Sequence, residues 1–106
     1  MAVLHLNSEN FEKEVLEAQE PVLVDFYADW CGPCKMVGPF FQEVSEKIEG
    51  VKFAKVNVDE EGDLAKEFGV QSIPTLVILK NKQEIARKIG FVMKNVLEAW
   101  VLENTK

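Results

Sequence analysis

Apolar residues along the chain occur either in continuous runs or at intervals of three and four residues. The continuous runs are rich in branched and aromatic side chains, which is typical of strands covered on both faces of a sheet. A shorter apolar run lies near the start of the chain, and one more strand returns after the turn at Asn81-Lys82. The pattern predicts strands at 3–6, 22–27, 53–58, 75–79 and 83–89.

Between these runs, apolar residues recur at helical spacing. Helices are predicted around Phe11 to Leu16, from the cysteines to about Ile48, in a short segment ending near Phe68, and at 92–101. Strands and helices alternate until a final hairpin and helix, so the chain is predicted to form an α/β sandwich with a mixed sheet covered on both faces. No linker or repeat interrupts this order, and we expect a single domain over 1–106.

The charge of the chain excludes some partners. Its 106 residues include 12 basic and 18 acidic side chains, which gives a net charge of −6. Such a surface repels phosphate backbones and anionic lipids, so neither nucleic acid nor membrane is an expected partner. No apolar run approaches the roughly 18 residues of a membrane span, and the first residues do not resemble a secretory signal. We therefore expect a cytoplasmic protein, and nothing in the sequence argues against a monomer.

The chain has two cysteines, Cys31 and Cys34. A disulfide between them closes a very small ring, which chain-entropy arguments credit with only about 2 kcal/mol of stabilisation. In a chain that looks cytosolic, an isolated C-x-x-C indicates redox chemistry or a metal site rather than a structural crosslink.

Cys31 stands between the end of a predicted strand and the start of a predicted helix. Free N–H groups and the positive end of the helix dipole there favour the thiolate, the reactive form of cysteine. Cys31 is therefore the candidate nucleophile, and Cys34, one turn further along, is placed to resolve a mixed disulfide. Pro33 suits the first helical turn and Gly32 lets another backbone approach. Trp30 offers an apolar surface beside the sulfur, or else is a core residue.

The segment Trp30-Cys31-Gly32-Pro33-Cys34-Lys35 resembles the active-site motif of thioredoxins of bacterial length. The similarity covers nearly the whole chain. Further matches lie at Val24–Ala28, Pro39, Lys55, Asp59, Ser72–Thr75 and Gly90. The resemblance implies the thioredoxin fold, a central mixed sheet of about five strands flanked by about four helices in the order βαβαβ and then αββα.

The resemblance also implies a general protein dithiol–disulfide oxidoreductase. In that activity Cys31 attacks a disulfide of a target protein, and Cys34 displaces the target and leaves a Cys31–Cys34 disulfide. A thioredoxin reductase then regenerates the dithiol, so electrons arrive from a partner protein and the chain itself binds no cofactor.

Asp25 lies inside an apolar strand, where an isolated carboxylate is costly and its pKa is expected to rise. The resemblance implies that Asp25 exchanges a proton with Cys34 when that thiol must attack. The alternative is a structural Asp25 paired with Lys55 on the neighbouring strand. Both interpretations can hold together, with Lys55 modulating Asp25.

Ile73-Pro74 precedes a predicted strand. In the family that it resembles, this peptide bond is cis and the proline lies against the active-site disulfide. We expect the Ile73 backbone to pair with an extended segment of the substrate, with Gly90 and Phe91 completing an apolar rim. The alternative is that Pro74 merely starts a strand.

Four residues depart from the family pattern. Tyr27 stands where Trp is common, and Phe91 where a smaller residue is common. Lys82 replaces the glycine of an Asn-Gly turn, so the geometry of that turn is expected to differ. Met93 occupies a position where a helix-capping residue is common, which weakens the cap.

Two other classes of function compete with the oxidoreductase. The same rim can belong to a binding module whose docking is only gated by redox state. Alternatively, the two cysteines are half of a tetrahedral zinc site, although His5 is the only histidine and has no obvious partners. The expectation is that the chain binds no metal.

Overall fold

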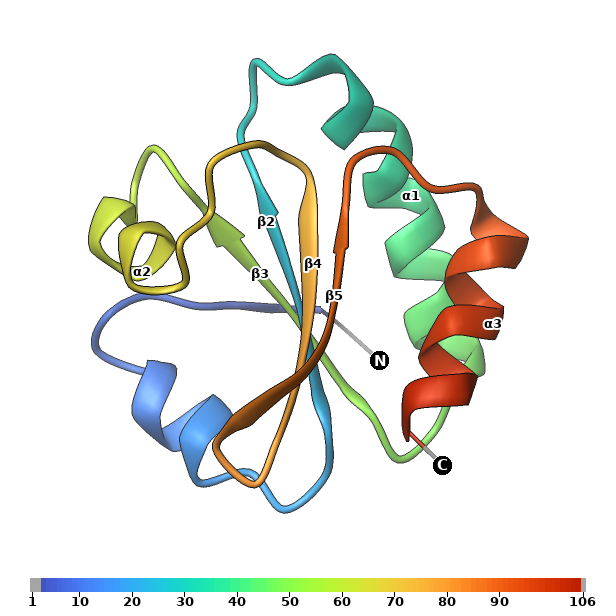
Figure 1. Cartoon of the computed structure of the whole chain (residues 1–106), viewed down its shortest axis with the longest axis horizontal. Helices are drawn as coiled ribbons and strands as arrows, with labels where there is room; N and C mark the ends of the chain where they lie inside the picture. The colour runs from blue at the N-terminus through green and yellow to red at the C-terminus, as the bar shows by residue number, and fades with distance from the viewer. Residues whose placement is uncertain (1–2, 106) are drawn as a thin grey trace.

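The structure is a computed structural model that describes residues 3–105. It confirms the predicted α/β architecture, with five strands and four helices in the expected order among these residues (Figure 1). The strands are β1 (Leu4–His5), β2 (Val22–Tyr27), β3 (Lys52–Asn57), β4 (Thr75–Lys80) and β5 (Gln83–Ile89). The helices are η1 (Glu12–Leu16), α1 (Gly32–Lys47), α2 (Gly62–Glu67) and α3 (Lys94–Thr105).

The strands form one mixed sheet in the order β1-β3-β2-β4-β5. β3 runs parallel to both β1 and β2, whereas β4 is antiparallel to β2 and to β5. The long, apolar β2 and β4 lie at the centre of the sheet, where both of their faces are buried. This explains why their sequences are nearly continuous apolar runs.

Helices cover both faces of the sheet (Figure 1). α1 and α3 pack on one face, with Phe41 and Leu97 fully buried against Leu23 and Ile78 of the sheet. η1 and α2 cover the other face, where Phe68 contacts both Phe11 and Phe26. Alternate residues of each strand enter the two cores, so residues of β2 with odd numbers face α1.

Two helices differ in detail from the sequence prediction. The segment around Val15 forms a short π-helix, in which the N–H of Glu17 donates to the carbonyl of Glu12 at 2.9 Å. α3 begins at Lys94, and the carbonyl of Met93 accepts from the N–H of Leu97 at 2.9 Å. Met93 therefore holds the position before the first helical residue, and its side chain has no strong acceptor for the free N–H groups there.

The prediction of an altered turn at Asn81-Lys82 is wrong. β4 and β5 are joined by a two-residue turn in which Asn81 and Lys82 both have positive φ, 54° and 69°. A turn of this kind matches the twist of the flanking strands, so the hairpin imposes it even on a lysine. This turn is unfavourable in conformational free energy at Lys82, because the Cβ of a residue in the left-handed region crowds the backbone.

We expect Lys82→Gly to raise the free energy of unfolding by about 1 kcal/mol, because glycine adopts positive φ without that crowding. Urea denaturation measures the change. Lys80→Gly is the matched control: Lys80 is an exposed lysine at the end of β4, where glycine is expected to destabilise. A Lys82→Gly protein less stable than the wild type would contradict this explanation of the turn.

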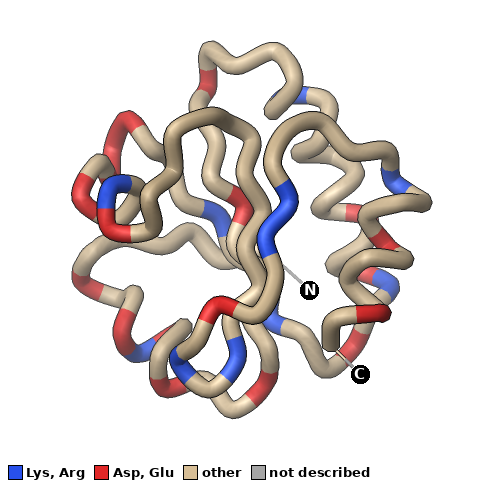
Figure 2. Tube along the Cα trace, in the orientation of Figure 1, with Lys and Arg blue, Asp and Glu red and all other residues tan. Residues whose placement is uncertain are grey.

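Charged side chains are spread unevenly over the molecule. Figure 2 shows few of them on the loop that leads into α1, at the top of the view, and many around the lower and left sides.

Between residues 3 and 105 no helix is long and apolar enough to cross a membrane.

Candidate functional site

The cysteine motif lies where β2 ends and α1 begins, at the upper edge of the sheet in Figure 1. Cys31 is the N-cap residue of α1, with extended backbone, and Pro33 stands in the first turn. A capping residue places its side-chain atom against the free N–H groups of the helix start. This local geometry places the Cys31 sulfur at the electropositive end of a 16-residue helix.

The two cysteines form a disulfide, with Cα atoms 5.2 Å apart. The backbone N–H of Cys34 donates to Cys31 Sγ, with N and Sγ 3.2 Å apart. Both residues are largely buried, with 4% of Cys31 and 5% of Cys34 exposed. The pairing is therefore the one that the spacing and the resemblance implied, and the donated hydrogen bond is aimed at the sulfur of Cys31.

A loop from the other side of the sheet covers this sulfur. Cys31 Sγ lies 3.7 Å from the carbonyl oxygen of Ile73. The Ile73-Pro74 peptide bond is cis, as the resemblance implied. The carbonyl of Pro74 accepts from the N–H of Gly90 at 2.8 Å, which ties this loop to the end of β5. In the described part of the chain, neither the N–H nor the carbonyl of Ile73 pairs with another backbone group.

Asp25 lies on β2, the strand that leads to the cysteine motif, and is buried, as its apolar neighbours predicted, with 1% of its surface exposed. Its Oδ1 atom has no hydrogen-bond partner among the described residues. Burial raises the pKa of the Asp25 carboxyl from its usual 3.8 to about 7, against the opposing positive charge of Lys55. The carboxyl therefore changes its protonation state near neutral pH.

Lys55 stands directly opposite Asp25 in the parallel pairing of β2 with β3. Among residues 3–105, however, the ion pair of the structural alternative is not formed; Lys55 Nζ instead lies 4.3 Å from the centre of the Tyr27 ring. Sequence reasoning missed this contact, because only the register of the two strands reveals it.

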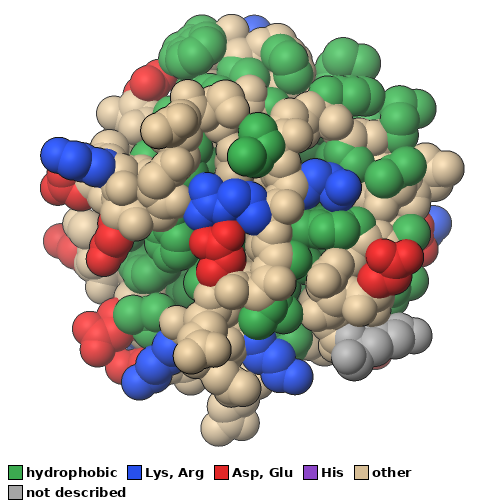
Figure 3. All heavy atoms as spheres, viewed as in Figure 1, with side chains coloured by type: hydrophobic (Ala, Val, Ile, Leu, Met, Phe, Trp, Pro, Cys, Tyr) green, Lys and Arg blue, Asp and Glu red, His purple; other side chains and the backbone are tan. Residues whose placement is uncertain are grey.

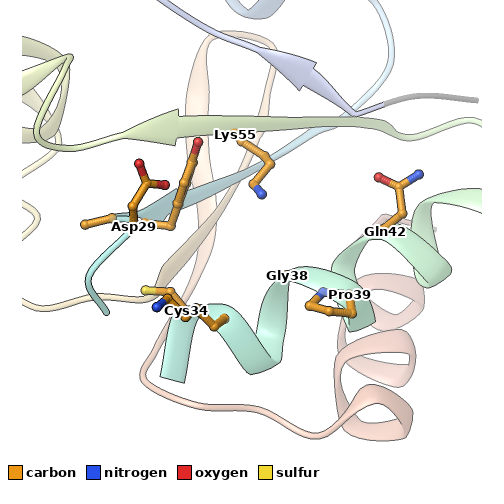
Figure 4. Close-up of a pocket in the computed structure, with 9 residues that line it drawn as sticks. Asp29, Cys34, Gly38, Pro39, Gln42 and Lys55 are labelled. Carbon is orange, nitrogen blue, oxygen red and sulfur yellow. The ribbon is translucent and has the colours of Figure 1, made fainter. Parts of the chain in front are cut away.

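A pocket of about 540 Å³ opens beside Lys55 and Tyr27. Figure 4 shows the Lys55 side chain pointing from β3 toward α1, with Cys34 at the start of that helix and Pro39 further along it. The lining consists of Tyr27, Ala28, Asp29, Cys34, Lys35, Gly38, Pro39, Gln42 and Lys55. The pocket thus gives solvent a route to the inner cysteine.

Trp30 is exposed, with 69% of its surface accessible, so the alternative of a core residue is wrong. Its indole N–H donates to Oδ2 of Asp59 at 2.8 Å. Asp59, in the acidic segment after β3, therefore holds the indole of Trp30 in place. The two residues are 29 positions apart, and no pattern in the sequence indicates that they meet.

The other side of the rim is apolar. Phe91 is 44% exposed and its ring packs against Phe40, with ring centres 6.4 Å apart. Gly32, Pro33, Met36 and Phe91 line a shallow pocket of about 460 Å³. Hydrophobic side chains are visible at the upper edge of the molecule in Figure 3. Gly32 has no atom within 4 Å of the place where a Cβ would stand, so the fold itself does not require glycine there.

Within residues 3–105, no group of three or more His, Cys, Asp or Glu side chains is arranged to hold a metal ion. A zinc site needs about four such ligands, and the cysteine pair supplies only two of them. The site that the residues do build consists of a disulfide, a buried carboxyl, a lysine and an apolar rim.

Comparison with known proteins agrees with this geometry. The family model described as Thioredoxin matches residues 2–103. A thioredoxin of Rickettsia felis is 46% identical over 98 residues, covering 92% of this chain and 93% of the relative, and a thioredoxin of Haemophilus influenzae is 43% identical over 100 residues, covering 93% and 94%. The crystal structure of a Malassezia sympodialis thioredoxin superposes with a TM-score of 0.89 at 35% identity, covering 99% of this chain and 92% of that one.

Proposed function

Because the chain belongs to the thioredoxin family and is a protein dithiol–disulfide oxidoreductase, we propose that Cys31 is its attacking thiol and Cys34 its resolving thiol. The observation that carries this assignment is the hydrogen bond from the Cys34 N–H to Cys31 Sγ at the start of α1. In the reduced protein the same N–H and the helix dipole stabilise negative charge on Cys31 and not on Cys34.

In the first step, the Cys31 thiolate attacks one sulfur of a disulfide in the target protein. The target's S–S bond breaks, a bond forms between Cys31 Sγ and the attacked sulfur, and the displaced sulfur leaves as a thiolate that takes a proton from solvent. This step involves no net oxidation or reduction, because one disulfide has been exchanged for another.

In the second step, Cys34 loses its thiol proton and attacks Cys31 Sγ. The mixed disulfide breaks, the second sulfur of the target leaves as a thiolate, and the Cys31–Cys34 disulfide forms. Two electrons have then passed from this chain to the target. Asp25 is proposed to accept the Cys34 proton, directly or through water, because its pKa of about 7 suits proton transfer at neutral pH. Lys55 modulates that carboxyl through its charge.

The segment of the target that carries the disulfide is proposed to lie along Ile73. The N–H and carbonyl of that residue pair with no other backbone group among the described residues, which supports pairing with an extended backbone beside the Cys31 sulfur. Trp30, Gly32, Pro33, Pro74, Gly90 and Phe91 would form the surrounding apolar contact surface.

The source of electrons is proposed to be a thioredoxin reductase, which returns two electrons and two protons to the disulfide. The chain is proposed to act as one domain and as a monomer, without a bound cofactor. A protein that reduces disulfides works in a compartment where thiols are kept reduced, so we propose the cytoplasm as its location.

A coupled assay tests this function. Wild-type protein, a disulfide-containing protein substrate, a thioredoxin reductase and its electron donor are mixed, and free thiols released from the substrate are counted. Multiple turnovers that require both proteins are expected. The variant with Cys31→Ser and Cys34→Ser together separates this function from a binding module: it is expected to release no thiols, and full activity of that variant would overturn the proposal.

A further inference from the structure

The ammonium group of Lys55 has two possible partners within reach of its side chain. Lys55 and Asp25 stand directly opposite each other on β3 and β2. Tyr27, two residues along β2 from Asp25, points to the same face and is the diagonal neighbour of Lys55. Long and aromatic side chains in such diagonal positions can touch.

The structure shows which partner holds the ammonium. Lys55 Nζ lies 4.3 Å from the centre of the Tyr27 ring, well within the distance of about 6 Å at which a cation is attracted to an aromatic face. The ion pair with Asp25 is not made among the described residues, and Asp25 Oδ1 is left without a hydrogen-bond partner. Both Lys55 and Tyr27 line the pocket that reaches Cys34; Lys55 and Cys34 are labelled in Figure 4.

We propose that Tyr27 is a positioning residue for the exchange reaction: its ring holds the Lys55 ammonium on the pocket wall, out of direct contact with the Asp25 carboxylate. This inference rests on the proton-acceptor role proposed above for Asp25. It assigns a role to the aromatic ring at position 27, although this side chain itself takes no part in the bond changes.

Two opposing effects set the pKa of the Asp25 carboxyl. Burial favours the neutral acid and the charge of Lys55 favours the carboxylate, and together they leave the pKa of Asp25 at about 7. Direct contact with the ammonium would stabilise the carboxylate further and lower that pKa. A carboxylate of lower pKa takes the Cys34 proton less readily, so the ring keeps Asp25 useful as an acceptor at neutral pH.

Other titratable groups near the pair are few. From α1, Cys34 and Lys35 face the pocket, and Asp29 faces it from the loop after β2. Burial, above all, raises the pKa of Tyr27 beyond its usual 10, and the charges of Asp29, Glu60 and Asp25 act in the same direction against a hydrogen bond with Asn57. The ring therefore stays neutral over the pH range in which Asp25 titrates.

The test is the pKa of Asp25 in the oxidised protein, followed by the carbon-13 NMR shift of its carboxyl carbon. Tyr27→Leu removes the ring and is expected to lower this pKa by about half a unit, which corresponds to the strength of a partly exposed cation–π contact. Tyr27→Phe and Tyr27→Trp keep an aromatic face and are expected to retain the wild-type value. A shift in Tyr27→Phe as large as in Tyr27→Leu would overturn the proposal.

The same measurement in a Lys55→Met protein distinguishes positioning of the ammonium from a simple change in the solvation of Asp25. In Lys55→Met protein there is no ammonium to position, so adding Tyr27→Leu is expected to produce no further shift in the pKa of Asp25. An equal shift with and without Lys55 would mean that the ring acts only by excluding water, and the proposal would be wrong.

One measurement needs no variant, and so stays decisive if Tyr27→Leu fails to fold. Protons on the Lys55 ε-carbon that lie over an aromatic ring are expected to show an upfield ring-current shift in wild-type protein. Random-coil shifts for those protons would overturn the proposal. These readouts are separate from turnover, so a failure of the proposed disulfide reductase activity would appear in the coupled assay and not here.

Discussion

A Cys34→Ser variant is expected to accumulate as a covalent mixed disulfide with its protein substrate. Cys31 keeps its place at the start of α1 and can still attack, but no thiol remains one turn away to displace the target. Mass spectrometry under non-reducing conditions should find most of the variant joined to substrate at a 1:1 mass after incubation. Wild-type protein under the same conditions should show little adduct, because Cys34 resolves it.

Cys31→Ser is the matched control, since it removes the other sulfur by the same change. It is expected to form no adduct, and its thiol release should fall to the background rate. Cys34 lacks the helix-start position and the donated N–H that stabilise a thiolate at Cys31, so its thiol is not expected to attack a target directly. Adducts formed by Cys31→Ser and not by Cys34→Ser would reverse the two assigned roles.

Asp25→Asn is expected to make the protein more stable and less active. Between pH 3.8, the usual pKa of the carboxyl, and its raised pKa of about 7, the unfolded chain has lost this proton while the folded protein still holds it. Stability therefore falls as pH rises through this range, and the loss is complete above the folded pKa. Replacing the carboxyl with an amide removes a penalty of about 4 kcal/mol at pH 8.

Urea denaturation at pH 4 and pH 8 measures this effect. The variant and the wild type are expected to have similar free energies of unfolding at pH 4, with the gain appearing by pH 8. Asp29→Asn changes an exposed carboxylate in the next loop and is expected to shift stability by less than about 0.5 kcal/mol at either pH. A variant that is no more stable than wild type at pH 8 would show that Asp25 is not held at a raised pKa.

The same Asp25→Asn variant should slow disulfide reduction on the order of tenfold to a hundredfold at neutral pH, since it has no base to take the Cys34 proton. Its rate should also lose the dependence on pH near 7 that Asp25 gives to wild-type protein. Initial rates from pH 5.5 to 8.5 measure both. Wild-type rates and an unchanged profile would remove Asp25 from the mechanism.

Much of this fold was predictable because its signals are local. The apolar runs of β2 and β4 exist because both faces of the sheet are covered, and apolar periodicity in α1 marks the face that meets Leu23 and Ile78. Cys31 was identified for a similar reason: a cysteine between a strand and a helix start is chemically distinctive within a few residues of sequence.

What sequence reasoning missed depends on contacts across the sheet or between loops. The indole of Trp30 meets Asp59 at a separation of 29 residues, and Lys55 meets the ring of Tyr27 and not Asp25. Both require the register and the placement of loops, which apolar patterns do not encode. At Lys82 the local preference of lysine for negative φ did not decide the turn. The twist of β4 and β5 imposes positive φ there instead.

The start of α1 makes the Cys31 sulfur a better anion than the Cys34 sulfur. Titration of both thiols in the reduced protein, followed by the NMR shifts of their β-carbons, measures this difference. We expect Cys31 to ionise at distinctly lower pH than Cys34 and below the value of about 8.5 of a free cysteine. Two thiols that ionise together near that value would contradict it.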